Sequence, residues 1–306
     1  MNLKDRLNFW KKVRHQKSNI YAKLENLNPT GSIKYRMAKH MLLQAIKQQK
    51  IKRGDTIIEA TTGNTGIAFA YLAEKYGFKM IAVMPENQTA ERITLIKNYN
   101  AKIILTPAKS GPMGAIIKRN QLLKKIAIAW TPDQFNNQEN VKAHELGIGR
   151  ELITQLTKQK VTPDYIVHGV GTGGTLMGIA KTLKTDYPNV KIIAVEPEES
   201  AVLSGGKVGE HNIQGIGEGF IPSLVDTSII DKIVTVHTNE AVKMVQYGLK
   251  NWNLSMGISS GANIVAIEKL SKLNDLKNKN VITIIADGIE RYLSVISAEF
   301  LVLSKK

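Results

Sequence analysis

The chain alternates short apolar runs with amphipathic segments along most of its length. The apolar runs are rich in isoleucine and valine, which is typical of strands covered on both faces. Between them, apolar residues recur at helical spacing, for example in residues 67–76 and 176–183. This alternation predicts an α/β fold with mostly parallel strands. The expected strands are Thr56–Glu59, Met80–Met84, Lys102–Leu105, Tyr165–His168, Ile192–Val195 and Val281–Ile285.

The composition is that of an ordinary globular protein, with 43% hydrophobic and 22% charged residues among 306. No apolar run approaches the length of a membrane span, and Met1–Gln16 is charged without the apolar core of a signal peptide. We therefore expect a cytoplasmic protein that does not contact a membrane. The absence of cysteine excludes disulfides, thiolate catalysis and cysteine-ligated metals, and we expect no metal site.

The charge is strongly positive, with 42 Lys and Arg against 26 Asp and Glu and a formal net charge of +16. Clustered basic residues would indicate nucleic-acid binding. Here they are scattered at helix-surface spacing, as in Lys118-Arg119 and Lys124-Lys125, and no stretch interleaves them with aromatic residues. The pattern favours a solvated surface over a nucleic-acid interface. The positive field would also attract small anionic substrates.

The segment from Val170 to Leu176 joins a predicted strand to a predicted helix. Glycines allow a tight turn that aims successive N–H groups at one point, and a helix N-terminus adds partial positive charge. The loop lacks the Gly-Lys-Ser/Thr of a Walker motif, and Leu176 stands where a dinucleotide fingerprint has its third glycine. The pattern predicts a phosphate cradle, with a turn that binds nothing as the alternative. Its members are Gly171, Thr172, Gly173, Gly174 and Thr175.

A second strand-to-helix loop precedes the helix predicted from Ile67. It gathers hydroxyl and amide donors at another helix N-terminus, which suits a carboxylate better than a phosphate. The alternative is an elaborate N-cap, since Thr and Asn are favoured there in any case. The loop consists of Thr61, Thr62, Gly63, Asn64 and Thr65.

A third segment, Asn28–Arg36, places Lys34 after a Pro/Gly/Ser turn and ahead of a helix predicted from Met37 toward Ile46. A lysine in such a turn is usually a surface charge. Taken alone, this segment carries little information about function.

In combination, order and spacing, the three segments resemble the fold-type II pyridoxal-phosphate enzymes. The resemblance is to the cysteine synthase (O-acetylserine sulfhydrylase) and cystathionine β-synthase group, and it runs from about Asn19 to Ser294. Further matching motifs are Met84-Pro85-Glu86, Glu91-Arg92, Asp133-Gln134-Phe135 before His144, Leu203–Gly206, Ile213–Gly217, Gly219–Pro222, Gly257–Ala262 and Glu290–Ser294.

The resemblance implies two three-layer αβα domains with twisted, mostly parallel sheets, as in the tryptophan synthase β subunit. Pyridoxal 5'-phosphate would lie in the cleft between the domains. Residues 36–138 would form a smaller domain that clamps the substrate. Residues 1–35 and 139–306 would form a larger domain that holds the cofactor phosphate. Relatives of this group are mostly homodimers, which we expect here as well.

The resemblance also assigns roles to individual residues. Lys34 would carry the cofactor as a Schiff base and act as the catalytic general base. The Gly171–Thr175 loop would hold the phosphate, and Asn64 would bind the phenolic oxygen of the ring. Gly288 stands where a serine normally faces the pyridine nitrogen. The substrate would be bound by Thr61, Thr62, Gly63, Thr65, Gln134 and Gly217.

The reaction implied is β-replacement on O-acetylserine, or a related O-activated serine, with sulfide as the nucleophile and L-cysteine as the product. Cystathionine formation from homocysteine and sulfide release from cysteine remain alternatives. A third is a degenerate homologue with little turnover. It is motivated by departures from the family pattern at Tyr35, Gly147-Ile148 and Gly288, and by Met1–Ser18, which has no counterpart in the family.

Overall fold

The computed structural model describes residues 10–15, 18–273 and 276–296. Most of Met1–Ser18 lies outside these residues. For this segment we expect neither a signal peptide nor a counterpart in the family. No helix in the described part of the chain is long and apolar enough to cross a membrane.

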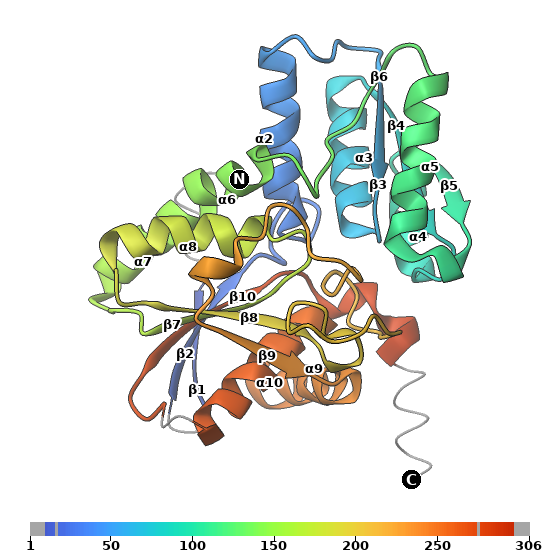
Figure 1. The fold of residues 1–306 in the computed structure, drawn as a ribbon. Coiled ribbons are helices and arrows are strands. Elements are labelled where there is room, and N and C mark those ends of the chain that lie inside the picture. Colours follow the sequence, from blue (N-terminus) through green and yellow to red (C-terminus); the bar gives the residue numbers. More distant parts are fainter. Residues whose placement is uncertain (1–9, 16–17, 274–275, 297–306) are drawn as a thin grey trace.

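The strands form two sheets that make up the two lobes of the molecule (Figure 1). The smaller sheet has the order β5-β4-β3-β6, and all of its pairs are parallel. The larger has the order β1-β2-β10-β7-β8-β9 and is parallel except for the β1–β2 pair. The strands are β1 (Trp10–His15), β2 (Ser18–Leu24), β3 (Thr56–Ala60), β4 (Lys79–Pro85), β5 (Lys102–Thr106), β6 (Ala129–Trp130), β7 (Tyr165–Gly169), β8 (Lys191–Pro197), β9 (Lys232–Val236) and β10 (Asn280–Ile285).

Helices cover both faces of each sheet, which gives two three-layer arrangements (Figure 1). In the larger lobe, α9 and α10 pack on one face, while α7 and α8 lie on the other. In the smaller lobe, α3 and α5 lie on opposite faces. The helices are α2 (Lys34–Lys47), α3 (Asn64–Tyr76), α4 (Ala90–Lys97), α5 (Gly111–Lys125), α6 (Glu139–His144), α7 (Arg150–Gln159), α8 (Gly174–Asp186), α9 (Thr238–Trp252) and α10 (Ile258–Leu273). Short 3-10 turns span Ala108–Ser110, Glu198–Ser200, Thr227–Ile229 and Ile289–Arg291.

The prediction of an α/β fold with parallel sheets is confirmed, and all six predicted strands form. The strands β1, β2, β6 and β9 were not predicted. Lysines interrupt the apolar pattern in β1 and β2, and β6 has only two residues. The predicted helices begin earlier than expected, α2 at Lys34 and α3 at Asn64. Their polar first turns hide the start from a hydrophobic pattern.

A buried ionic cluster fixes the start of α2 against the larger lobe. We call Lys23, Glu25, Arg36 and Glu151 the junction cluster, and all four side chains are at most 6% exposed. The Arg36 guanidinium lies 2.7 Å from oxygens of both Glu25 and Glu151. The Lys23 amine lies 2.9 Å from Glu151. Two cations therefore meet two anions, and each charge has a partner.

Two departures from the family pattern have structural explanations. Tyr35 is buried in the core of the smaller lobe, where its ring packs edge-on against Tyr71 with centroids 6.0 Å apart. Gly147 and Ile148 lie in a π-helical turn, Glu145–Gly149, and the Ile148 side chain is fully buried. Both substitutions thus serve packing, which does not itself indicate a loss of activity.

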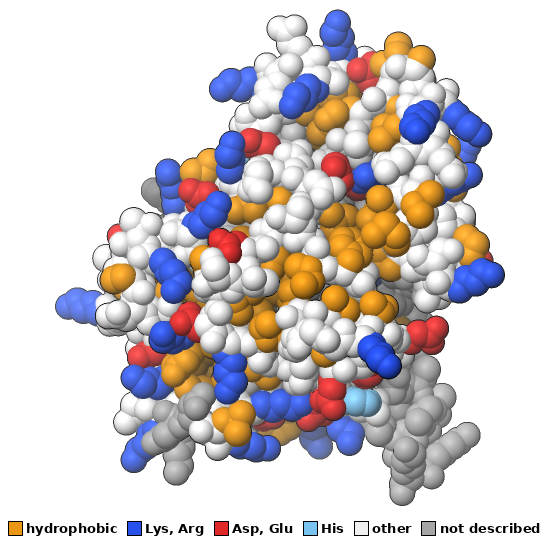
Figure 2. Space-filling model, in the orientation of Figure 1, with side chains coloured by type: hydrophobic (Ala, Val, Ile, Leu, Met, Phe, Trp, Pro, Cys, Tyr) orange, Lys and Arg blue, Asp and Glu red, His pale blue; other side chains and the backbone are white. Residues whose placement is uncertain are grey.

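Seen from outside, apolar side chains gather on one face at the waist between the two lobes (Figure 2). Lys and Arg side chains are spread over the rest of this face, singly and in small groups (Figure 2).

Candidate active site

A cavity lies between the two lobes, beyond the carboxyl ends of β3 and β7. Ligands of open parallel sheets bind at such strand ends. The empty space between the lining residues is about 720 Å³, part of it open to solvent. Nine of the predicted site residues line it: Lys34, Thr62, Asn64, Thr65, Gln134, Gly171, Thr172, Gly173 and Thr175. Five do not line it: Thr61, Gly63, Gly174, Gly217 and Gly288.

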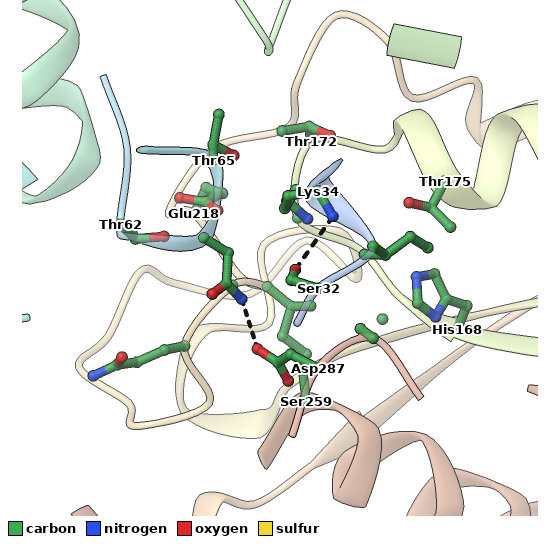
Figure 3. A pocket seen from close by; sticks show the side chains of 18 of the residues that line it. Ser32, Lys34, Thr62, Thr65, His168, Thr172, Thr175, Glu218, Ser259 and Asp287 are labelled. Carbon is green, nitrogen blue, oxygen red and sulfur yellow. Dashed lines mark hydrogen bonds between the residues drawn. The ribbon is translucent and has the colours of Figure 1, made fainter. Parts of the chain in front are cut away.

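Lys34 is the first residue of α2, and its amine faces the cavity together with Thr65, Thr172 and Thr175 (Figure 3). Burial lowers the pKa of Lys34 from its ordinary value, against the attraction of Glu218 and Asp287. No ion pair joins the Lys34 amine to an acid in the described part of the chain. The result is a buried amine biased toward its neutral, nucleophilic form.

The Gly171–Thr175 loop opens α8 with the geometry of an anion site. Gly173 has a φ of 85°, a left-handed conformation that favours glycine, and the first N–H groups of α8 have no partner within the helix. Thr172 accepts a hydrogen bond from Asn140 at 3.0 Å. The hydroxyl of Thr175 lies 3.3 Å from Nε2 of His144, and burial lowers the pKa of His144 well below its usual range. A neutral His144 leaves the loop without a competing fixed charge.

A hydrogen-bonded chain holds Asn64 at the opposite wall. Its amide nitrogen donates to Asp287 at 2.6 Å, and its amide oxygen accepts from Arg291 at 2.6 Å. Tyr292 donates to the same Asp287 oxygen at 2.6 Å (Figure 3 shows Asp287 below Lys34). The second oxygen of Asp287 is buried without a donor among the described residues. A buried acceptor of this kind invites a donor from a ligand.

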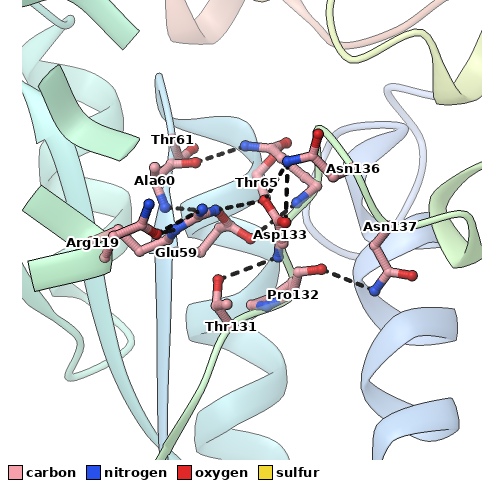
Figure 4. A network of polar contacts seen from close by, with 12 residues as sticks. Glu59, Ala60, Thr61, Thr65, Arg119, Thr131, Pro132, Asp133, Asn136 and Asn137 are labelled. Carbon is pink, nitrogen blue, oxygen red and sulfur yellow. Dashed lines mark hydrogen bonds and ion pairs between the residues drawn. The ribbon is translucent and has the colours of Figure 1, made fainter. Parts of the chain in front are cut away.

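Gln134 is hydrogen-bonded to the loop of Thr61–Thr65 and to the strand before it. Figure 4 shows the surrounding polar network, with Glu59, Arg119 and Thr65. Its amide nitrogen donates to the Ala60 carbonyl at 2.7 Å, and its amide oxygen accepts from the Thr65 hydroxyl at 2.7 Å. Its backbone N–H donates to Glu59, which pairs with Arg119 at 3.2 Å. Burial raises the pKa of Glu59 to about 7, against the opposing charge of Arg119. These hydrogen bonds fix the position of the Gln134 side chain relative to the first turn of α3.

Thr61 and Gly63 serve the shape of the second loop. The Thr61 hydroxyl accepts from the N–H groups of Gly63, at 2.9 Å, and Gly66, at 3.1 Å. Gly63 has a φ of 140°, and a side chain there would collide with Arg92. Thr61 therefore holds the loop against the first turn of α3, whose N-cap is Gly63.

Among the lining residues that were not predicted are two titratable ones, Glu218 and His168. Glu218, between Gly217 and Gly219, lines the cavity, and burial raises its pKa against the charges of Lys34 and Arg92. His168, at the end of β7, lines it as well, and burial together with Lys34 lowers the pKa of His168 to about 3. A lone acid in an otherwise uncharged glycine-rich segment was the available signal for Glu218.

Asp and Glu do not gather with His in any group that could hold a metal ion, in the part of the chain that the structure describes. The charged and titratable groups that line the cavity are Lys34, Arg92, His168, Glu218 and Asp287, beside the hydroxyl-bearing loops at the N-termini of α3 and α8.

Comparison with known proteins gives a consistent result. The sequence pattern of the family described as "Pyridoxal-phosphate dependent enzyme" matches residues 6–287. A cysteine synthase from Staphylococcus aureus is 44% identical over 278 residues, which cover 90% of this chain and 88% of the relative. Cysteine synthase B from Campylobacter jejuni is 41% identical, covering 90% of each chain.

Solved structures are similar as well. A hydrogen sulfide-producing enzyme from Fusobacterium nucleatum superimposes with a TM-score of 0.87 and 39% identity, covering 94% of this chain and 86% of the other. An O-acetylserine dependent cystathionine β-synthase from Helicobacter pylori gives a TM-score of 0.88 and 36% identity, covering 96% and 97%. With 94–96% of this chain covered, the similarity includes both lobes.

Proposed function

This chain belongs to the pyridoxal-phosphate dependent enzyme family, and we propose that it makes L-cysteine by β-replacement on O-acetylserine with sulfide. The observation that carries the proposal is a half-buried lysine, without an ion-pair partner among the described residues, that faces a glycine-rich helix N-terminus across one cavity. The similarity to two bacterial cysteine synthases supports the choice of reaction.

The residues of the cavity fit the family's cofactor. A phosphate suits the N–H groups and hydroxyls of the loop that opens α8. The Lys34 amine is available for covalent attachment, and the unpartnered oxygen of Asp287 offers an acceptor to a ring donor. Gly288 does not line the cavity and Asp287 does, so in this proposal Asp287 would take the place of Gly288 in holding the ring. When bound, the cofactor supplies an electron sink for charge that develops at the substrate's α-carbon.

The chain's own residues would then perform three tasks. Lys34 removes and returns the α-proton. Thr62 and Thr65, with the N–H groups at the start of α3, bind the substrate carboxylate. Gln134, whose backbone N–H donates to Glu59, positions Thr65 by accepting a hydrogen bond from its hydroxyl. Closure of the two lobes excludes water from the site.

We also carry over a two-domain division, with residues 36–138 as the smaller domain and 1–35 with 139–306 as the larger. The location of β3 to β6 within residues 56–130 supports it. A cytoplasmic homodimer acting on a small amino acid and sulfide completes the proposal.

The test is to purify the protein with added pyridoxal phosphate and record its visible spectrum. O-acetylserine, O-phosphoserine, serine and cysteine are then added in turn, with and without sulfide, and cysteine and sulfide are measured. The proposal predicts a visible cofactor band that O-acetylserine changes and cysteine production that requires sulfide. A protein that never acquires the band would refute it, and a band that no amino acid changes would indicate a degenerate homologue.

A second candidate is sulfide release from cysteine at the same site. The similarity to the hydrogen sulfide-producing enzyme of Fusobacterium nucleatum favours it, as does the acid at position 218. The cysteine arm of the same experiment measures this activity directly.

A further inference from the structure

Glu218 borders both the inner cavity that contains Lys34 and a larger outer cavity that opens toward solvent. The outer cavity lies between Asn87 and Gln88 of the smaller lobe and residues 208–212 of the larger. In Figure 3, Glu218 lies near Thr62 and Thr65, across from Lys34. Thr62, Gln214, Gly215 and Ile216 border both cavities as well, and Glu218 is the charged residue of this shared boundary.

The backbone around Glu218 holds an unusual shape. Gly215, Gly217 and Gly219 have φ values of 97°, 68° and 81°, all in the region that favours glycine. The Gly217 N–H donates to the Val170 carbonyl at 3.1 Å. This bond ties the segment to the Gly171–Thr175 loop, which is predicted to hold the cofactor phosphate. A Cβ atom built on Gly171 would lie 3.6 Å from Oε1 of Glu218. The glycines thus present the single charged side chain of this turn to the cavity.

The electrostatic surroundings leave the Glu218 proton available. Among the described residues, no ion pair within 4 Å involves Glu218. Arg92, the nearby cation from α4, already donates to the Thr62 carbonyl at 2.9 Å and the Tyr292 hydroxyl at 2.7 Å. Lys34 on α2, Asp287 after β10 and His168 on β7 are the other ionisable groups that line the cavity. Burial raises the pKa of Glu218, and a raised pKa suits an acid that works near neutral pH.

We propose that Glu218 is a catalytic acid–base residue that exchanges a proton with the sulfur atom on the substrate's β-carbon. The inference rests on the proposed function, which places an amino acid between Lys34 and this carboxylate. It assigns the site a capacity for sulfide release in addition to cysteine formation.

The proton transfers balance as follows. In sulfide release, the Cα–H bond breaks, its proton passes to the Lys34 amine, and its electron pair forms the Cα–Cβ double bond. The Cβ–S bond breaks with its pair on sulfur, and protonated Glu218 gives its proton to that sulfur. Hydrogen sulfide leaves, Glu218 ends as a carboxylate and Lys34 as an ammonium. Solvent in the outer cavity returns a proton to Glu218. In the opposite direction the Glu218 carboxylate accepts the proton of an S–H nucleophile as the Cβ–S bond forms.

The two leaving groups differ in their need for an acid. Acetate is the anion of a carboxylic acid and departs without protonation. Sulfide is the anion of a weaker acid, so its departure gains more from a proton delivered in the transition state. Loss of the acid should therefore affect sulfide release much more than cysteine formation from O-acetylserine.

The experiment compares Glu218→Gln with wild type as the cofactor-loaded enzyme. Sulfide release from cysteine and cysteine formation from O-acetylserine are measured across pH. We expect Glu218→Gln to lower sulfide release about 100-fold or more and cysteine formation less than about tenfold. Wild-type sulfide release should fall as pH rises through the pKa of Glu218, and this limb should be missing in the variant. Glu74→Gln, which alters an exposed acid of α3 that lines neither cavity, is the matched control.

Glu218→Ala provides an independent readout, because added formate should partly restore its sulfide release by supplying the missing acid. An equal loss of both activities in Glu218→Gln, with an unchanged pH profile, would overturn the inference while leaving the proposed function intact. Sulfide release that is absent in wild type, alongside normal cysteine formation, would overturn it too. Absence of any cofactor band in wild type would refute the proposed function itself.

Discussion

Lys34 and Arg36 lie two residues apart at the start of α2, yet they belong to opposite kinds of electrostatic environment. Arg36 is part of the junction cluster, where two cations and two anions are joined by contacts of 2.5–2.9 Å. Lys34 faces a cavity whose acids, Glu218 and Asp287, form no ion pair with it. One region contains satisfied buried charges and the other contains unsatisfied ones.

The difference separates stability from reactivity. Paired charges stay ionised, so the bonds around Arg36 lower the pKa of Glu151 to about 2 even though burial alone would raise it. In the cavity, burial dominates and moves the pKa values of Lys34 and Glu218 toward neutrality. Groups biased in this way can exchange protons near neutral pH, which paired charges cannot do. The junction cluster thus holds the helix that presents the reactive amine.

The largest expected effect is that of Lys34→Ala on activity. It should lower cysteine formation about 1000-fold or more, because it removes both the covalent attachment and the α-proton base. Mass spectrometry after borohydride reduction should find no cofactor on the variant. Its free energy of unfolding should change little, since no ion pair is broken. Lys47→Ala, an exposed lysine of the same helix, is the control. Full activity of Lys34→Ala would end the assignment of this residue.

Arg36→Ala should mainly lower the free energy of unfolding, whereas Lys34→Ala mainly lowers activity. It leaves Glu25 and Glu151 buried without their main cation, and breaking a buried pair in this way costs about 3–5 kcal/mol. Urea unfolding of the apo-protein measures this loss. Arg150→Ala, an exposed arginine at the start of α7, should change the free energy of unfolding by less than about 1 kcal/mol. Equal stability of the two variants would contradict the view that the junction cluster holds α2.

A smaller effect is expected on the stability of the folded protein at acidic pH. The pKa of Glu151 is about 2 in the folded protein and near 4.5 in the unfolded chain, so the unfolded state binds more protons between these values. Its contribution to stability is complete above pH 4.5 and is lost as the pH falls toward 2. Thermal unfolding of wild type should therefore show a steeper decline over this interval than Glu151→Gln. Parallel curves would mean that Glu151 is not held ionised by Arg36 and Lys23.

The local pattern of apolar and polar residues was sufficient to predict the α/β class of the fold and most of its strands. Alternating apolar runs predicted six strands, and five of them are inner strands of the two sheets, where burial on both faces requires continuous Ile and Val. The glycine-rich loops after β3 and β7 were located because tight strand-to-helix turns need glycine at particular positions. Order and spacing of three segments identified Lys34 as the cofactor lysine, which remains a prediction.

Only the tertiary structure decided which charges are paired. Arg36 reaches Glu151 across 115 residues of sequence, while Lys34 beside it finds no such partner. Glu218 and Glu210 are both acids of one loop-rich segment, and only the first lines the inner cavity. Burial and pairing are set by distances between elements remote in the chain, so no local pattern could distinguish the structural charges from the reactive ones.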